Sequence, residues 1–301
     1  MTLAIPELWS PADHAAVDSL VRACVESDLL SALVAIEALA HMPSEVALRP
    51  AEVILRSEPE MDAAGLAVAA RIAELSVRAR LEVDRGASGY EALVEVLVSQ
   101  ETFVGDTSRY FAPENSLVSS VMARKKGQPI LLSCVWILVG RGAGIDVVGL
   151  GFPGHFLVTV EGHIVDPFGG GRVMGISQLK RLAEGAQPPR PGEAPRPFDK
   201  AWLEPVGVPA IAARILRNLA HAFEQREDPD GAYRALRALA AITPDDGQVQ
   251  VAVAQRTEDY GAWPEALSMY RKIARSFKDR REGQIGELKV IELESKSRIL
   301  N

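Results

Sequence analysis

The chain has 301 residues, of which 48% are hydrophobic and 24% charged, and its formal net charge is −7. This length allows about two domains, and the acidic balance excludes the basic surface that drives nucleic-acid binding. No apolar run reaches the roughly 18 residues of a membrane helix, and the first residues lack the basic start and apolar stretch of a secretory signal. We therefore expect a cytoplasmic protein with neither a membrane nor a nucleic-acid partner.

The N-terminal third of the chain has the apolar period of helices. Ser10 is suited to cap the first helix, and Pro11 suits its first position. Apolar residues then recur three and four positions apart, and the pattern resumes after Pro43 and Pro50. We assign residues 1–100 to an N-terminal helical region whose helices form a core.

The next part of the chain combines helices with strands. Residues 114–145 predict two helices joined at the segment KKGQP, with Pro129 in the first turn of the second helix. Strands are expected in DVVGLGF, HFLVTV and HIVDPF, and the last two are joined at Glu161-Gly162. A helix that leads into an antiparallel hairpin is an α+β arrangement, and we assign it to residues 101–185.

The C-terminal part begins with a proline-rich linker, residues 186–204, and continues as helices over residues 205–301. Two of the helical segments superpose with an offset of 34, so that Ala232 matches Ala266, and this is the period of the tetratricopeptide repeat. An unrelated pair of helical hairpins is the alternative interpretation. Stacked repeats form concave surfaces, so we expect a protein or peptide partner here.

The stretch GFPGHFLVTVEGHIVDPFGGG, residues 151–171, is the richest in groups suited to catalysis. With a two-residue turn at its centre, Leu157 pairs with Asp166, and His155 shares the face of Asp166 as a diagonal neighbour. A three-residue turn would separate the two side chains. A carboxylate behind an imidazole orients a general base, so they form a candidate catalytic pair. His163 falls on the other face, as a solvated turn residue.

A pair of this kind needs a nucleophile. In papain-like and transglutaminase-like enzymes it is a cysteine at the start of the preceding helix, where the helix dipole lowers the thiol pKa. Here residues 129–132 read Pro-Ile-Leu-Leu, while Ser133 and Cys134 come later in the helix. Cys134 is either a buried, inert residue or the nucleophile of a thiol hydrolase or acyltransferase that also uses His155 and Asp166.

Three segments, NSLVSSVMARKKGQP, GFPGHFLV and VDPFGGGRV, resemble the bacterial SirB-type family, and the likeness extends over residues 100–280. The resemblance implies a transglutaminase-like core followed by tetratricopeptide-like helices. It implies a fold and a domain order rather than a reaction, because the biochemical function of the family is largely undefined. Members commonly have a hydroxyl residue at the position of Leu131 and generally lack the thiol of active transglutaminases; Cys134 matches a variable apolar position.

Four residues of the matching segments are candidate binding residues beside His155, namely Asn115, Arg124, Gly154 and Phe156. For Asn115 the alternative interpretation is a helix cap, with Ser116 as the other capping candidate.

The sequence thus predicts a mostly helical α+β protein with a papain-like core and a small antiparallel sheet. We interpret it as a non-catalytic, degenerate transglutaminase-like module that binds a protein or peptide through the helical repeats and the groove near His155. No cofactor is expected, and a metal site formed by His155, His163 and Asp166 is disfavoured because the hairpin separates the two histidines.

Overall fold

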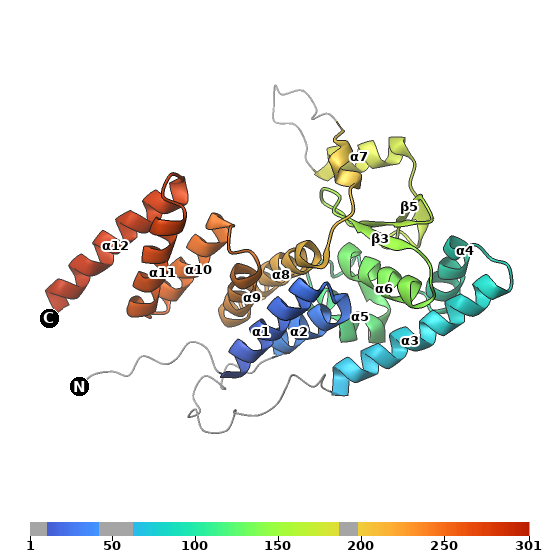
Figure 1. Ribbon diagram of the computed structural model, residues 1–301, viewed down its shortest axis with the longest axis horizontal. Coiled ribbons are helices and arrows are strands. Elements are labelled where there is room, and N and C mark those ends of the chain that lie inside the picture. The colour runs from blue at the N-terminus through green and yellow to red at the C-terminus, as the bar shows by residue number, and fades with distance from the viewer. Residues whose placement is uncertain (1–10, 42–62, 187–197, 301) are drawn as a thin grey trace.

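The computed structural model describes residues 11–41, 63–186 and 198–300. These residues form a mostly helical molecule with two small sheets, as expected for the α+β class. In Figure 1 the C-terminal helices extend away from the remaining elements as an arm. The following predicted features lie outside the described residues: the cap at Ser10, the breaks at Pro43 and Pro50, and most of the proline-rich linker.

The consecutive helices predicted in the N-terminal third are present in its described residues. They are α1 (Pro11–Glu26), α2 (Leu29–His41), α3 (Ala63–Asp84), α4 (Gly89–Leu93) and the π-helical segment η2 (Val94–Gln100). Asp28 begins α2 by accepting hydrogen bonds from the backbone and hydroxyl of Ser31. Ser88 and Glu91 form a capping box at the start of α4. Local polar signals therefore fix where α2 and α4 begin.

Two helices joined by a short connection follow, as predicted. The elements here are β1 (Val104–Gly105), the 3₁₀ turn η3 (Pro113–Ser116), α5 (Val118–Arg124), β2 (Lys126–Gly127) and α6 (Pro129–Gly142). The strands β1 and β2 pair in parallel. Pro129 lies in the first turn of α6. Residues 129–137 of α6 are all buried, and α3 and the strands β3 and β4 pack against this helix. A helix that is apolar on all sides must be covered on all sides, so α6 is the centre of the core.

A four-stranded antiparallel sheet in the order β3-β4-β5-β6 lies against α6. Its strands are β3 (Val147–Leu150), β4 (Leu157–Val160), β5 (His163–Asp166) and β6 (Arg172–Val173). Val158 pairs with Val165, and the residues between the strands, Glu161 and Gly162, both have positive φ. This is the predicted two-residue turn, and the predicted register is confirmed. The short strand β6 was not predicted.

Helices make up the rest of the described chain. They are α7 (Ile176–Ala186), the 3₁₀ turn η4 (Lys200–Leu203), α8 (Val208–Gln225), α9 (Pro229–Ile242), α10 (Gly247–Asp259), α11 (Trp263–Ser276) and α12 (Arg281–Leu300). Helices α8 and α9 pack together, as do α10 and α11. Helix α11 begins and ends 34 residues after α9 (263 against 229, and 276 against 242), the spacing that the sequence predicts.

One hydrophobic core runs from α1 to α10 through all three of the predicted regions. Leu20 of α1, Trp136 of α6 and Leu216 of α8 all belong to it. Helix α8 packs against α1 and α2 as well as α9, so segments far apart in the sequence lie side by side. Smaller clusters lie beneath α7, around Phe152, and between α10, α11 and α12, around Tyr270. Helix α8 is therefore part of the same folded unit as the sheet.

Replacing Leu216 by alanine tests this placement of α8. We expect Leu216→Ala to lower the free energy of unfolding by about 2 to 5 kcal/mol, because Leu216 is fully buried and its truncation leaves a cavity. The control is Leu288→Ala on α12, where the side chain is 68% exposed and the expected change is within about 0.5 kcal/mol. Urea unfolding followed by tryptophan fluorescence measures both variants. Equal effects would contradict the assignment of α8 to the core.

Candidate functional site

His155 and Asp166 form a shielded pair beside the β4–β5 hairpin. Nε2 of His155 lies 2.8 Å from Oδ1 of Asp166, and Asp166 is fully buried. The register brings them together, since His155 is two residues before Leu157 and so shares the sheet face of Asp166. This is the contact that the predicted two-residue turn and strand pairing require. The catalytic role of the two residues stays a prediction.

Asp166 is the centre of a larger hydrogen-bond network. Its Oδ1 also accepts from the amide of Gly169 at 3.1 Å, and its Oδ2 accepts from Nε and Nη2 of Arg172 at 3.1 and 2.9 Å. Burial acts to raise the pKa of Asp166, but the hydrogen bond and charge of His155, the Gly169 amide and the Arg172 charge hold this pKa below its usual value. The carboxylate therefore ties the hairpin to the turn that leads into β6.

Two glycines allow the backbone to approach this pair closely. A Cβ on Gly169 would lie 2.5 Å from Oδ2 of Asp166, which is too close for any side chain. Gly154, a predicted binding residue, lies in the turn before His155 with φ 65°, and a Cβ there would lie 2.4 Å from the Cβ of Ala186. Glycine is thus required on both sides of the pair for reasons of space or backbone conformation.

A row of aromatic rings leads from His155 to the surface of α8. The ring centroids of His155 and Phe168 are 5.7 Å apart, and those of Phe168 and Tyr110 are 6.0 Å apart. Tyr110 then contacts Phe111 at 5.1 Å, and Phe111 contacts His221 at 5.1 Å. Phe111 is 53% exposed, which is unusual for a phenylalanine. We call these five residues the aromatic row.

Arg214 of α8 lies next to His155, and no pattern in the sequence indicates this position. Its Nη1 donates to the carbonyl of Phe152 at 2.9 Å, and the backbone amide of His155 donates to the same carbonyl at 3.2 Å. The guanidinium carbon is 5.6 Å from the ring centre of Phe156. Phe156, a predicted binding residue, is itself buried. Arg214 and Phe152 are 62 positions apart, so no local pattern could place them together.

The start of α6, where a thiol enzyme would carry its nucleophile, offers no reactive group. Leu131 is fully buried, and Ser133 is buried with its hydroxyl donating to the carbonyl of Phe156 at 3.3 Å. Cys134 is fully buried, and burial raises the pKa of its thiol. The other cysteine, Cys24, is also buried, with its pKa raised in the same way. Neither thiol has the exposure or the lowered pKa of a nucleophile.

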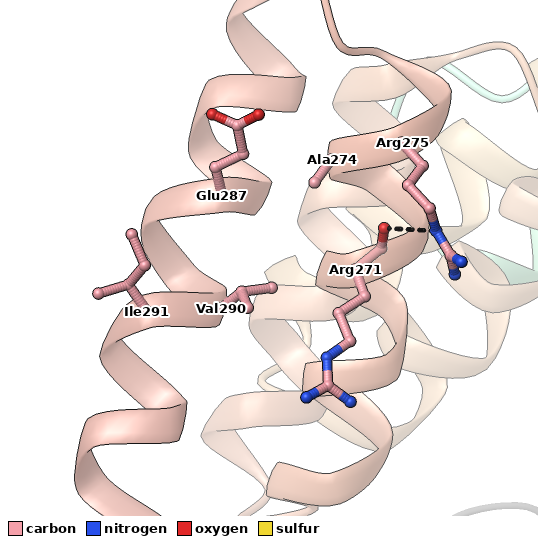
Figure 2. A pocket seen from close by; sticks show the side chains of 6 residues that line it. All are labelled: Arg271, Ala274, Arg275, Glu287, Val290 and Ile291. Atoms are coloured by element: carbon pink, nitrogen blue, oxygen red, sulfur yellow. Dashed lines mark hydrogen bonds between the residues drawn. The ribbon is translucent and has the colours of Figure 1, made fainter.

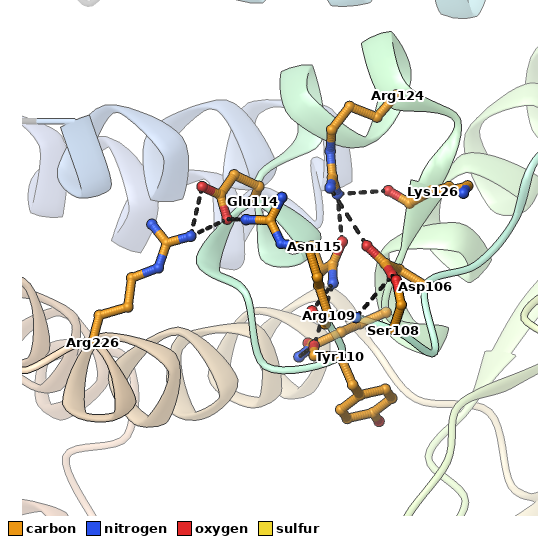
Figure 3. A network of polar contacts seen from close by, with 10 residues as sticks. Asp106, Ser108, Arg109, Tyr110, Glu114, Asn115, Arg124, Lys126 and Arg226 are labelled. Atoms are coloured by element: carbon orange, nitrogen blue, oxygen red, sulfur yellow. Dashed lines mark hydrogen bonds and ion pairs between the residues drawn. The ribbon is translucent and has the colours of Figure 1, made fainter.

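Asn115 and Arg124 are in contact, but Asn115 is not a helix cap. Helix α5 begins after Leu117 without a side-chain cap, so the capping alternative for Asn115 and Ser116 is wrong. The physical reason is that Asn115 is fully buried and points inward (Figure 3). Its Nδ2 donates to the carbonyl of Arg109 at 2.7 Å, and its Oδ1 accepts from Arg124.

The contacts of Asn115 belong to a network that fixes the loop before η3. Asp106 accepts hydrogen bonds from the hydroxyl of Ser108 and the amide of Arg109, and Arg124 lies 3.5 Å from Asp106. On the other side, Arg226 binds both carboxylate oxygens of Glu114, at 2.7 and 2.6 Å. Figure 3 shows the ring of Tyr110 pointing away from Asp106, Asn115 and Arg124. The network thereby fixes the loop from which Tyr110 contributes its ring to the aromatic row.

His163 lies apart from the pair, as the register requires. It is exposed at the start of β5, with its ring 6.0 Å from that of Tyr90. In the part of the chain that the structure describes, no three histidine, cysteine or carboxylate side chains lie close enough to hold a metal ion.

The comparison with known families agrees with this architecture. A family model described as the transglutaminase-like superfamily matches residues 66–217, about half of the chain. The chain belongs to the transglutaminase-like superfamily. The match runs from α3 to α8 and so includes the His155–Asp166 pair, the start of α6 and Arg214.

Relatives of this superfamily member occur in bacteria and mammals. A UPF0162 protein of Xylella fastidiosa (strain Temecula1) is 37% identical over 150 residues, covering 48% of this chain and 52% of the relative. A UPF0162 protein of Vibrio cholerae is 26% identical over 162 residues, covering 52% and 58%. The mouse F-box only protein 21 is 25% identical over 201 residues, covering 62% of this chain and 30% of its own length. The chain spans about half the length of the UPF0162 relatives that it matches. No solved structure matches the chain.

A second feature of the transglutaminase-like protein lies far from His155, in the C-terminal arm. An open hollow of about 530 Å³ lies between α11 and α12 (Figure 2). The residues around it are Arg271, Ala274, Arg275, Glu287, Val290 and Ile291. Within the described residues, no helix is long and apolar enough to cross a membrane.

Asp166→Asn tests how much the hydrogen-bond network of Asp166 contributes to the free energy of unfolding. Losing the charged hydrogen bonds to His155 and Arg172 is expected to lower the free energy of unfolding by about 1 to 3 kcal/mol at pH 7. Because the folded-state pKa of Asp166 lies below its unfolded value, this contribution is fully present above about pH 4 and is lost as the pH falls through the folded pKa. The difference between the urea midpoints of the two proteins should therefore be constant from pH 7 to about pH 4 and should shrink as the pH is lowered further. Parallel curves would contradict the prediction.

Proposed function

We propose that this protein is a catalytically silent transglutaminase-like module that binds a protein or peptide at the surface beside His155. The observation that carries the proposal is the burial of the start of α6, where Leu131 and Cys134 are both inaccessible. A thiol becomes a nucleophile as the thiolate, and burial disfavours the charged form. His155 therefore has no activated thiol to which it could act as base.

The aromatic row supports a binding role. It combines a well-exposed ring, Phe111, with partly buried rings that lead toward His155. Aromatic side chains contribute large contact areas at a small cost in conformational entropy, and they dominate the energetics of many protein interfaces. An exposed aromatic group held in place by a buried polar network is well suited to receive an apolar side chain of a partner.

The C-terminal helices supply the second part of the proposed surface. We assign α8 to α11 to a tetratricopeptide-like array and the chain to the SirB-type branch, on the basis of the 34-residue spacing and the motifs NSLVSSVMARKKGQP and GFPGHFLV. The protein would then act in the cytoplasm as an adaptor, with one contact near His155 and another along the arm. The hollow between α11 and α12 is a candidate position for the second contact.

A thiol acyltransferase is the alternative function, and the retained His155–Asp166 pair favours it. In that reaction His155 would take the proton of the Cys134 thiol, and the thiolate sulfur would attack the acyl carbon of an amide or ester. The bond from that carbon to the leaving amine or alcohol would break as the thioester forms, and His155 would pass its proton to the leaving group. This would require Cys134 to leave its buried position before it could react.

Alkylation by iodoacetamide at pH 7.5 separates the two functions. Because burial shields the thiol of Cys134 and raises its pKa, we expect native Cys134 to react far more slowly than the same thiol in 8 M urea. Mass spectrometry of tryptic peptides gives the rate for each cysteine, and the buried Cys24 serves as the internal reference. Faster alkylation of Cys134 in the native protein than in urea would establish an activated thiol and overturn the non-catalytic proposal.

Partner capture tests the binding role. We expect wild-type protein and Cys134→Ala to retain the same partner from the native lysate, and Phe111→Ala to lose it, because that change removes the exposed ring of the aromatic row. The matched control is Leu81→Ala on α3, a 47% exposed hydrophobic residue outside the row. Quantitative mass spectrometry of the captured proteins provides the comparison. Retention of every partner by Phe111→Ala would contradict the proposed surface.

A further inference from the structure

Arg214 differs from the other arginines of its helix in its electrostatic surroundings. Arg217 forms an ion pair with Asp246 at 2.9 Å, and Arg226, at the end of α8, forms one with Glu114. In the described ranges no carboxylate lies within ion-pair distance of Arg214, which is only partly exposed and donates to one neutral carbonyl. A desolvated cation without an anion is energetically unfavourable, and burial lowers the pKa of Arg214.

The guanidinium is held in a fixed position despite lacking an anion. The carbonyl of Phe152 accepts from both Arg214 Nη1 and the amide of His155, so the cation and the histidine are attached to the same backbone group. The ring of Phe156 supports the guanidinium from one side. Among the residues that the structure describes, only Nη1 has a hydrogen-bond partner, so Nε and Nη2 can act as the planar fork that binds carboxylates.

Tyr110 provides a second donor near His155, since the ring of Phe168 lies 5.7 Å from that of His155 and 6.0 Å from that of Tyr110. Its backbone carbonyl accepts from Gln128 Nε2 at 3.0 Å and from Asn115 Nδ2 at 3.3 Å, so these two hydrogen bonds fix the residue without using its side-chain hydroxyl. Within the described part of the chain, its hydroxyl forms no hydrogen bond. Burial raises the pKa of Tyr110, whereas the positive charge of Arg214 acts to lower it.

We propose that Arg214 and Tyr110 form a carboxylate-binding subsite beside His155, which receives an acidic group of the bound peptide. The proposal rests on the binding function inferred above and names the chemistry that would be recognised. A single guanidinium matches the single charge of a carboxylate, whereas a phosphate dianion would leave an uncompensated charge in a partly buried site. The carboxylate would come from a chain terminus or from an acidic side chain, and the aromatic row would receive the neighbouring apolar group.

Two pairs of small probes test the subsite on the full chain by isothermal titration calorimetry. The first pair is N-acetyl-phenylalanine and its amide, which differ in a terminal carboxylate. The second is the N-acetylated aspartyl-phenylalanine amide and its asparaginyl counterpart, which differ in a side-chain carboxylate. We expect the carboxylate member of at least one pair to bind about tenfold more tightly than its amide, and the responding pair identifies the source. No preference in either pair, including a case in which only inorganic phosphate binds, would overturn the proposal.

Variants with a matched control assign the preference to Arg214. We expect Arg214→Gln to remove the carboxylate preference, and Tyr110→Phe to reduce it about threefold by removing one hydrogen bond. Arg217→Gln removes the same charge from the same helix at an exposed position and should leave the preference unchanged. If Arg214→Gln unfolds, as judged by circular dichroism, Arg214→Lys replaces it, and it should weaken the preference because the planar fork is lost. A folded variant at position 214 with full preference would overturn the assignment.

These probes do not depend on the natural partner. Partner capture through Phe111 without any carboxylate preference would remove the subsite and leave the proposed function intact. A carboxylate preference without any partner captured through the aromatic row would count against the function and leave the subsite in place.

Discussion

The complete burial of α6 is the constraint on which the rest of the structure depends. This helix is apolar on every side, so elements from distant parts of the chain must cover it. Helix α3 lies along it, the sheet packs against it, and the shared core extends from it to α8. The arrangement explains why the N-terminal and C-terminal helices form one core, although their sequences read as separate regions.

The same constraint determines the chemistry of the site. A thiol enzyme needs an accessible cysteine at the start of this helix, but here Leu131 and Cys134 are packed into the core. The His155–Asp166 pair is preserved on the neighbouring hairpin, where Asp166 also holds Arg172 and Gly169. The pair has a structural role, since it ties the hairpin to the following turn and positions His155 at the inner end of the aromatic row, beside Arg214.

Local sequence signals predicted several features correctly. Proline at the first turn set the start of α6, and Glu161-Gly162 set a two-residue turn, which fixed the register and placed His155 in contact with Asp166. The capping interpretation of Asn115 failed because a polar residue before a helix can turn inward as readily as it can cap. Arg214 and Tyr110 were not predicted as site residues, because their positions near His155 depend on segments that meet only in the folded chain.

By itself, the sequence determined the mostly helical α+β class, the hairpin register and the absence of a thiol at the start of α6. These follow from apolar period, turn chemistry and residue identity, which act over a few residues. The tertiary structure alone decided that α8 completes the core, that Asn115 faces inward, and that Arg214 lies beside His155. Each of these depends on packing between distant segments, which is set by how the surfaces of helices and sheet fit together and leaves no periodic pattern in the chain.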